Sequence, residues 1–391
     1  MEYEVVVVGA GPAGSAAAQR LAEKGIKTAL VERKFLPRHK TCAGAVSGKA
    51  LPYLGEGFLH LTEDRLTGMV FRYRYRDQVG YRTDAPYAYT VTRDRFDHHL
   101  AVRAVQAGAE LIEGQEVKCI TREGGWFMVS TEKATLKARA VVGADGAGSL
   151  VARTFGLARK FLGVAVEALV PLEKVRDHEV YRETVFLDYG FIPKGYAWIF
   201  PKSDHLNVGL GTFSARSVPV KFLLEQYLDR CFPYLEQRDR KDLSWSGHPI
   251  PVYRGGRFSG DGVLVVGDAA GLLDPFFGEG IHFALESSLL AVGVIERYLE
   301  GGASLGEYDR RLDEKILRQF QVAHKVAWLF YHLTGAVHRH LVRKGRIIRE
   351  FTALVTGKQS YHSFGRWLRH NILKEALSRV PDDDHFLRPG E

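Results

Sequence analysis

A glycine-rich turn near the amino terminus is the first group of residues whose spacing could do chemistry. Gly9, Gly11 and Gly14 follow the pattern G-x-G-x-x-G directly after the apolar run Val5–Val8. In a strand-to-helix turn of this kind, the first glycine allows a tight bend and the second lets the backbone approach a pyrophosphate. The third permits close packing of the helix on the strand. The helix that follows turns unpaired N–H groups and the positive end of its dipole toward the phosphates.

An acidic residue completes this unit. Thr28–Val31 is predicted to be a second buried strand, and Glu32 follows it directly. A carboxylate there can accept hydrogen bonds from a ribose diol and would repel a 2′-phosphate, which argues against NADP at this site. A glycine turn without a ligand is the alternative, but the order strand, turn, helix, strand and acid favours a dinucleotide site.

Three further segments narrow the identity of the nucleotide. Asp145-Gly146 follows the buried run Ala140–Ala144, Gly267-Asp268 follows Val263–Val266, and Arg93 lies in Val91–Asp97. Each alone could be a loop aspartate or a surface arginine. In the chain order Arg93, Asp145-Gly146 and Gly267-Asp268 after a βαβ unit, they resemble the flavoprotein superfamily of the aromatic hydroxylases, which implies FAD as the cofactor.

The resemblance also implies where the cofactor lies. Asp268 is expected to contact the ribityl chain, Arg93 to lie against the cofactor, and Gly278–Gly280 to face the flavin N1/O2 edge. A helix start at that edge would stabilise the negative charge of reduced flavin. The expected cofactor-binding residues are Gly9, Gly11, Ala13, Gly14, Glu32, Arg33, Cys42, Ala43, Gly44, Arg93, Val117, Asp145, Gly146, Gly267, Asp268, Pro275, Gly278, Glu279, Gly280 and Ile281.

Two other motifs suggest the reaction. The loop Lys40–Leu51 contains Cys42, and Tyr196–Pro201 reads Y-A-W-I-F-P. Together with Gly357–Tyr361, they resemble the geranylgeranyl reductase family. The resemblance implies hydrogenation of trisubstituted C=C bonds of geranylgeranyl chains by reduced FAD, with Cys42 as the catalytic residue over the flavin. It implies a substrate site formed by Tyr196, Trp198, Phe200, Pro201, Gly209 and Gly211.

The residue types suit that reaction. An isolated alkene has no activating carbonyl, so the site must exclude water and hold the bond against the flavin. Tyr196, Trp198 and Phe200 alternate along a strand and share one face, which could line an apolar channel. They could equally form an ordinary sheet core, and Cys42 could be a small buried hydrophobic residue. The rival functions are an aromatic monooxygenase, a flavin-dependent halogenase and a non-catalytic flavin scaffold.

The elements that must position these residues predict an α/β fold. A Rossmann-type FAD-binding domain is expected to carry an inserted, mainly antiparallel β substrate domain and a C-terminal helical region. Turn signals lie at Lys194-Gly195 and Pro249. The expected regions are 1–65, 91–155 and 256–300 for the FAD-binding domain, 66–90 and 156–255 for the substrate domain, and 301–391 for the helices.

Charge and cysteine usage bear on location and partners. The 391 residues carry a net charge of +8, and Lys315–Val380 holds thirteen Lys or Arg against two acids, mixed with aromatic residues. This mixture favours an anionic membrane surface over nucleic acid, although a solvated helical cover is the alternative. Val326–Val337 is too short to span a bilayer. No signal peptide is expected, and three separated cysteines without metal spacing fit the cytoplasm.

The electron donor and the substrate's head group stay open at this point. The sequence holds no second G-x-G-x-x-G in a βαβ context, so no separate nicotinamide domain is expected. We expect NAD(P)H or ferredoxin to bind transiently, and the substrate to be an isoprenoid or lipid.

Overall fold

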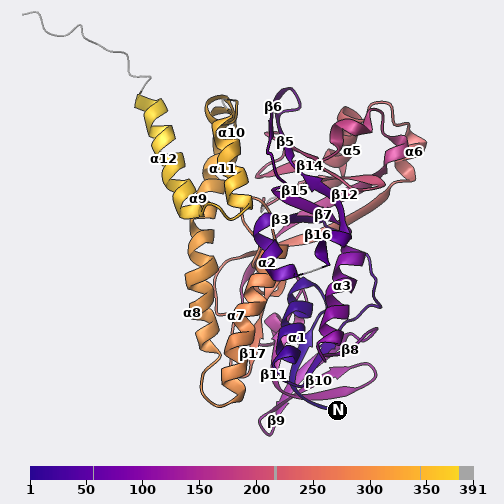
Figure 1. The fold of residues 1–391 in the computed structure, drawn as a ribbon, viewed down its shortest axis with the longest axis vertical. Coiled ribbons are helices and arrows are strands. Elements are labelled where there is room, and N and C mark those ends of the chain that lie inside the picture. Colours follow the sequence, from indigo (N-terminus) through magenta and orange to yellow (C-terminus); the bar gives the residue numbers. More distant parts are fainter. Residues whose placement is uncertain (56, 215–217, 344, 378–391) are drawn as a thin grey trace, which may run out of the picture.

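The computed structural model describes residues 1–377 apart from 56, 215–217 and 344. Two seven-stranded sheets, one three-stranded sheet and a helical region at the carboxyl end make up the fold (Figure 1). The predicted class, a Rossmann-type α/β domain with an antiparallel insertion and C-terminal helices, is confirmed. The bounds predicted for the three regions stay a prediction.

The first seven-stranded sheet holds the glycine-rich turn. Its strands run in the order β8-β2-β1-β11-β10-β9, with β17 also paired to β11. Pairing is parallel except between β9 and β10 and between β10 and β11. The bounds are β1 Glu2–Val8, β2 Thr28–Val31, β8 Glu110–Ile112, β9 Val117–Glu123, β10 Trp126–Thr131, β11 Thr135–Gly143 and β17 Val263–Val265. Burial on both faces explains the continuous apolar runs of β1, β2 and β17.

Helices cover this sheet. Helix α1 (Pro12–Glu23) packs between α3 (Arg93–Gln106) and α7 (Ile281–Leu299), as Figure 1 shows in its lower half. Pro12 is the first residue of α1, where its missing N–H costs nothing, and Gly25, in the left-handed region at φ 77°, follows its end. The short helices nearby are η1 Gly48–Ala50, α2 Leu51–Leu54, η2 Phe58–Leu61, α4 Leu150–Thr154 and η5 Gly267–Ala270.

The second seven-stranded sheet is the inserted one. Its order is β16-β12-β15-β14-β13-β5-β6, and all pairs are antiparallel except β13 with β5. The bounds are β5 Gly68–Tyr73, β6 Asp77–Arg82, β12 Lys160–Pro171, β13 Thr184–Tyr189, β14 Gly195–Pro201, β15 His205–Thr212 and β16 Ser244–Tyr253. Pro249 lies inside β16, so the turn expected there is wrong. A proline is tolerated because β16 is an edge strand.

Smaller elements connect the sheets. Part of the region predicted to belong to the substrate domain, β7 (Ala88–Val91), instead pairs with β3 (Ala45–Ser47) and β4 (Thr62–Leu66) in the three-stranded sheet. Helix α5 packs against β12 and β15. The remaining elements here are η3 Leu172–Lys174, η4 His178–Tyr181, α5 Val220–Cys231 and α6 Gln237–Lys241.

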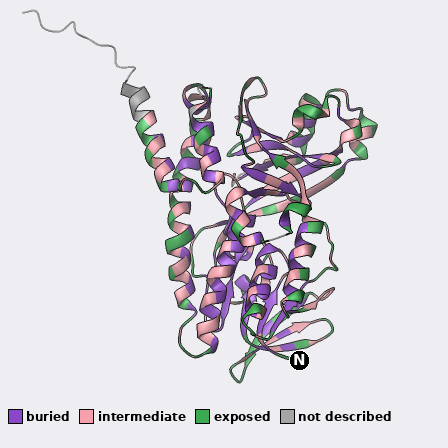
Figure 2. Ribbon diagram, viewed as in Figure 1, coloured by how far each residue is buried: buried purple, intermediate pink, exposed green. Residues whose placement is uncertain are grey.

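From Gly306 onward the described chain is mainly helical, as expected. Figure 2 shows these helices with buried, intermediate and exposed residues, while β2 and β17 of the first sheet are buried throughout. The bounds are α8 Gly306–Leu312, η6 Asp313–Leu317, α9 Arg318–His332, α10 Thr334–Val337, η7 His338–Val342, α11 Arg346–Val355 and α12 Tyr361–Leu377. No helix in the described residues is long and apolar enough to cross a membrane.

Candidate active site

A cavity of about 980 Å³ lies between the two large sheets and continues beneath the helical region. One part, which we call the nucleotide groove, is lined by the glycine turn, residues 31–34 and 38–45, residues 144–148 and Asp268. The other part, which we call the apolar arm, is lined by Leu66, Met69, Phe71, Val185, Leu187, Tyr189, Phe276, Phe277, Phe330, Tyr331, Phe351 and Val355.

The three glycines of the first turn have distinct surroundings. Gly9 has a φ of 102°, and a Cβ on it would lie 2.5 Å from the carbonyl oxygen of Ala144. A Cβ on Gly14 would lie 1.8 Å from the oxygen of Gly9, so only glycine lets α1 pack this closely. Gly11 instead faces the groove, where the nearest atom to such a Cβ is an Arg38 nitrogen at 3.9 Å. The backbone at Gly11 is therefore open to a pyrophosphate.

Glu32 is held rigidly at the groove wall. Its side chain is 5% exposed, and its two carboxylate oxygens accept hydrogen bonds from the N–H groups of Ala10 (2.9 Å) and Lys34 (3.1 Å). Arg38 adds an ion pair at 3.5 Å. A carboxylate has about four acceptor positions, so capacity remains for a ribose diol.

The two aspartates of the groove differ in their partners. Asp145 caps α4, because it accepts hydrogen bonds from the Ser149 hydroxyl (2.5 Å) and the Leu150 N–H (2.6 Å). Asp268 lines the cavity, and its carboxylate accepts no hydrogen bond from any described residue, so the carboxylate oxygens are available to ligand hydroxyls. The groove thus offers helix termini, a buried acid with spare acceptor capacity and a free carboxylate, which fits a dinucleotide with a sugar-alcohol chain.

Helix α7 begins at the cavity wall, where Gly278, Glu279, Gly280 and Ile281 line it. The preceding loop is organised by Asp274, a buried residue that sequence reasoning missed. Its Oδ1 accepts hydrogen bonds from the N–H groups of Phe276 (2.8 Å) and Phe277 (2.9 Å), and burial raises the pKa of its carboxyl.

Ser47 and Lys49, which precede α2, hold the other end of that loop at Glu279. Glu279 forms an ion pair with Lys49 at 2.6 Å and accepts a hydrogen bond from Ser47. Charged and hydroxyl groups that are distant in sequence therefore fix the backbone that faces the expected flavin edge.

The cysteine loop also lines the cavity. Gly44 has a φ of 68°, and a Cβ there would lie 2.0 Å from the Val91 oxygen. The sulfur of Cys42 accepts a hydrogen bond from the Gly44 N–H (3.3 Å), and Arg93 lines the same part of the cavity. Arg93 is itself paired with the buried Asp97 at 2.8 Å. The structure therefore places Cys42 and Arg93 together on the wall.

A buried lysine supports this loop. Lys202 directly follows Pro201, and its Nζ donates hydrogen bonds to the carbonyls of Ala43 (2.7 Å) and Val91 (2.8 Å). Burial lowers the pKa of Lys202 to about 8. A single lysine at the end of an aromatic element gives little sequence signal of this role.

The aromatic element forms the wall between groove and arm. Tyr196, Trp198, Phe200 and Gly211 line the cavity, and the Tyr196 hydroxyl donates to the carbonyl of Phe277. Gly209 does not line the cavity. It lies under the Trp198 ring, where a Cβ would come within 2.4 Å.

A few expected residues support the wall without forming it. Pro201 is buried behind the wall, and its carbonyl accepts a 2.8 Å hydrogen bond from Thr90. Among the expected cofactor residues, Gly14, Gly267 and Pro275 likewise do not line the cavity, whereas all the others do.

The apolar arm is a continuous aromatic chamber. Phe276 lies 5.3 Å from Phe330 and 5.4 Å from Phe351 between ring centroids, and Phe330 lies 5.1 Å from Tyr189. No charged side chain is among the described residues that line this arm. Such a surface accepts hydrocarbon and excludes water.

Comparisons with known proteins agree with this geometry. Residues 2–186 match the FAD binding domain family, and residues 165–243 match the geranylgeranyl reductase catalytic domain. A digeranylgeranylglycerophospholipid reductase of Methanocaldococcus jannaschii is 31% identical over 336 residues, which cover 80% of this chain and 83% of the relative. The chain belongs to the geranylgeranyl reductase family.

Two further proteins are similar to this reductase. A chloroplastic geranylgeranyl diphosphate reductase of Nicotiana tabacum is 31% identical over 363 residues, covering 87% of this chain and 75% of the relative. The solved structure of a geranylgeranyl bacteriochlorophyll reductase-like protein from Thermoplasma acidophilum has a TM-score of 0.74 and 22% identity, and covers 97% of both chains. At 22% identity, the similarity to this solved structure supports the fold alone.

The family match confirms the predicted cofactor and reaction class. The reductase is an FAD-dependent oxidoreductase that hydrogenates isoprenoid chains. The match over residues 165–243, which contain the aromatic element, supports the reductase over the monooxygenase and halogenase alternatives.

Proposed function

We propose that the reductase saturates C=C bonds of a geranylgeranyl chain carried by a membrane lipid, with the chain in the apolar arm and the polar head outside it. The observation that carries this proposal is the lining of the arm, which is aromatic and aliphatic without a charged side chain among the described residues. A phosphate placed there would lose its hydration without gaining a cation.

The site residues have separable tasks in this proposal. Reduced FAD, which Gly11, Glu32 and Asp268 of the nucleotide groove would hold, would supply a hydride for one carbon of the double bond, and a proton would be added to the other carbon. Two electrons and one proton, with the electrons coming from a donor, would restore the reduced cofactor. Trp198, Phe200 and Tyr196 hold the alkene at the junction of groove and arm. Cys42 lies on the same wall and either positions the alkene or assists the delivery of the proton.

The donor in this proposal docks transiently. The sequence has one G-x-G-x-x-G in a βαβ context, and the groove around it is taken by FAD. NAD(P)H or ferredoxin would therefore reach the cofactor without a binding domain of its own.

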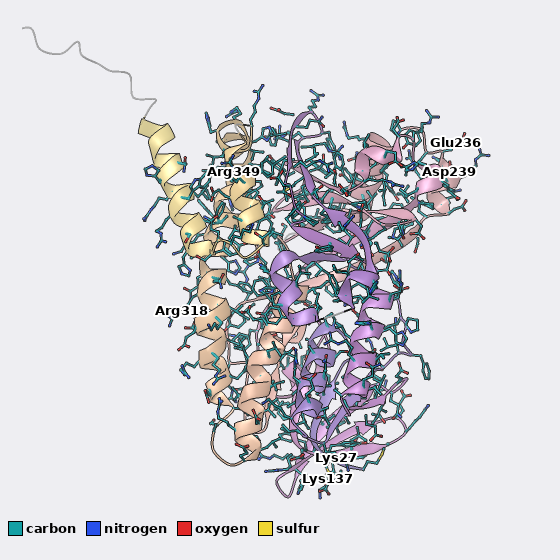
Figure 3. All side chains as sticks on the ribbon, in the orientation of Figure 1. Lys27, Lys137, Glu236, Asp239, Arg318 and Arg349 are labelled. Atoms are coloured by element: carbon teal, nitrogen blue, oxygen red, sulfur yellow. The ribbon has the colours of Figure 1, made fainter. Side chains whose placement is uncertain are left out.

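The helical region is the proposed docking face for an anionic membrane. Along α9, Arg318, Lys325, Trp328 and His332 are exposed, and Trp328 is 61% exposed. Figure 3 shows Arg318 and Arg349 on this side, whereas Lys27 and Lys137 lie at the base of the nucleotide-binding half.

The other aromatic residues of the predicted basic segment have a different place. Phe330 and Phe351 are buried and line the apolar arm. The segment continues past residue 377, beyond the described residues. The support for docking therefore rests on the exposed residues of α9, α11 and α12.

Reduction of a lipid substrate tests the proposal directly. Purified holoenzyme is incubated with dithionite and a geranylgeranyl ether lipid in liposomes, and the product is read by mass spectrometry. Two hydrogens gained per saturated bond are expected. Oxygen-dependent oxidation of NAD(P)H with an aromatic substrate, and no gain of hydrogen on the lipid, would point to a monooxygenase.

A further inference from the structure

Glu167 is a buried acid in the middle of an apolar strand. It lies in β12, is 1% exposed and lines the cavity. In the sheet it is paired with Ser246 of β16 and Gly209 of β15, and Gly209 is paired with Trp198 of β14. These residues form one row across four strands, and the side chains of such a row point to the same face.

Three donors converge on this carboxylate. Oε1 accepts hydrogen bonds from the backbone N–H of Cys42 (3.2 Å) and the hydroxyl of Ser246 (3.0 Å), and Oε2 accepts one from the Asn207 side chain (3.0 Å). The residue acts only as an acceptor in all three. A carboxylate can do this with both oxygens, whereas an amide offers one acceptor and one donor group.

The indole of Trp198 fixes the direction of these bonds. Its Nε1 donates to Asn207 Oδ1 at 2.8 Å, and an indole N–H can only donate. Asn207 must therefore turn its NH₂ group toward Glu167. The missing side chain at Gly209 leaves room for the Trp198 ring to lie across β15 and reach Asn207, two residues away on the same face.

The cysteine loop is thus held by hydrogen bonds from two sides. Glu167 accepts from the N–H of Cys42, and Lys202 donates to the carbonyl of the next residue, Ala43. Both charged residues come from the sheet that carries the aromatic element. The position of Cys42 and the orientation of the Trp198 ring are consequently set by one hydrogen-bonded network.

We infer that Glu167 is a positioning residue that sets the Cys42 loop and the Trp198 ring relative to each other, and so holds the alkene in register with the reactive edge of the cofactor. The inference rests on the proposed function, in which the prenyl chain passes Trp198. A displacement of about 1 Å at such a site lowers the rate of the chemical step by up to about a hundredfold.

Glu167→Gln is the test variant, because it keeps shape and removes one acceptor. We expect kcat for the hydrogenation of a geranylgeranyl lipid to fall at least about tenfold. FAD content and KM should change little. Asp188→Asn is the matched control, since Asp188 is a buried acid of the same sheet, bonded to Arg72 and Tyr227 and absent from the cavity wall.

A double variant separates positioning from general damage. In Trp198→Phe the indole donor is gone, so Asn207 can turn and satisfy a glutamine at position 167. Adding Glu167→Gln to Trp198→Phe should therefore lower kcat much less than Glu167→Gln lowers it in the native protein. Full additivity would overturn the inference.

A substrate-independent measurement distinguishes failure of this inference from failure of the proposed function. The alkylation rate of Cys42 by iodoacetamide in the holoenzyme, read by peptide mass spectrometry, should rise several-fold in Glu167→Gln and not in Asp188→Asn. If that rise occurs while the native protein reduces no prenyl lipid, the proposed function fails and the positioning role stands. If both the alkylation rate and kcat stay at native values, Glu167 is only a structural acid and the inference is wrong.

Discussion

The hydroxyl of Tyr361, in the first turn of α12, donates a 2.7 Å hydrogen bond to Oδ2 of Asp274 in the loop before α7. Both residues are buried. Since Oδ1 of the same carboxylate holds the backbone of Phe276 and Phe277, this bond ties the carboxyl-terminal helices to the loop that lines the cavity.

Tyr361→Phe tests this tie. The variant leaves a buried carboxylate with one donor fewer, which costs about 1–3 kcal/mol of unfolding free energy. We expect a lower melting temperature and weaker retention of FAD. Tyr308→Phe is the control, because Tyr308 is also buried but bonds to the carbonyl of Val265. Equal loss of FAD in both variants would show that the tie has no special role.

Gly11→Val tests the pyrophosphate site. The new Cβ would enter the groove with only an Arg38 nitrogen within 4 Å, at 3.9 Å, so the chain should fold yet purify without FAD. Gly14→Val should instead fail to fold, because its Cβ would overlap the Gly9 carbonyl. Absorbance near the flavin bands and far-ultraviolet circular dichroism read the two outcomes. Unchanged flavin stoichiometry in Gly11→Val would contradict the assignment.

Cys42→Ala tests the catalytic assignment. We expect alkene hydrogenation to fall at least about tenfold, while FAD content and flavin reduction by dithionite stay near native values. The reason is that the thiol lies on the cavity wall but its loop is held through backbone atoms. Turnover at the native rate would make Cys42 a packing residue.

Lys202 should give the protein a pH-dependent stability. Its pKa is about 8 when folded, against an ordinary value of 10.5, so the unfolded chain binds more protons between these pH values. The free energy of unfolding therefore rises by about 3 kcal/mol in all as the pH increases from about 8 to 10.5. This contribution is lost again as the pH falls through the same window to about 8.

Lys202→Met removes this dependence. In urea unfolding of the holoenzyme, we compare the free energy of unfolding of the variant with that of the native protein. The difference, variant minus native, should be more positive at pH 7 than at pH 10. Lys133→Met, at an exposed position, is the control. A difference between Lys202→Met and native protein that does not vary with pH would contradict the assigned cause.

Membrane docking should depend on charge at the helical region. We expect Lys325→Glu, Arg349→Glu and Arg369→Glu together to reduce co-sedimentation with anionic liposomes, since each exposed cation near such a surface contributes about 1 kcal/mol. Lys27→Glu, Lys133→Glu and Arg238→Glu, also exposed, form the matched control. Binding of the native protein should fall as salt rises, because salt screens these contacts. Absence of binding at low salt would leave the helices as a solvated cover.

Local signals in the sequence predicted much of the nucleotide-binding half. The strand Thr28–Val31 has the bounds expected from its apolar run, and a helix follows the glycine turn as expected. These elements depend on neighbours in the chain, which periodicity detects. The residues of the nucleotide groove could be predicted because the geometry of the glycine turn itself requires those residue types.

The rest depended on distant contacts. Phe330 and Phe351 have the same residue types and basic surroundings as a surface helix, yet packing against the inserted sheet buries them. The acceptors Glu167 and Asp274 serve donors from other segments, and only the pairing of strands and helices brings those donors near. A single acid within the apolar run Val164–Val170 was the one available signal for Glu167.

The walls of the apolar arm come from β5, β13, α9 and α11, whereas the nucleotide groove is built mainly by the first sheet and its helices. The two compartments share the loop of residues 276–280 and the aromatic wall of β14. Replacement of Phe71, Phe330 or Phe351 by a smaller residue would change the shape of the apolar arm. It would leave the residues expected to hold the cofactor unchanged. Divergence in substrate length and branching can therefore proceed in one half of the molecule while the redox machinery is inherited unaltered in the other.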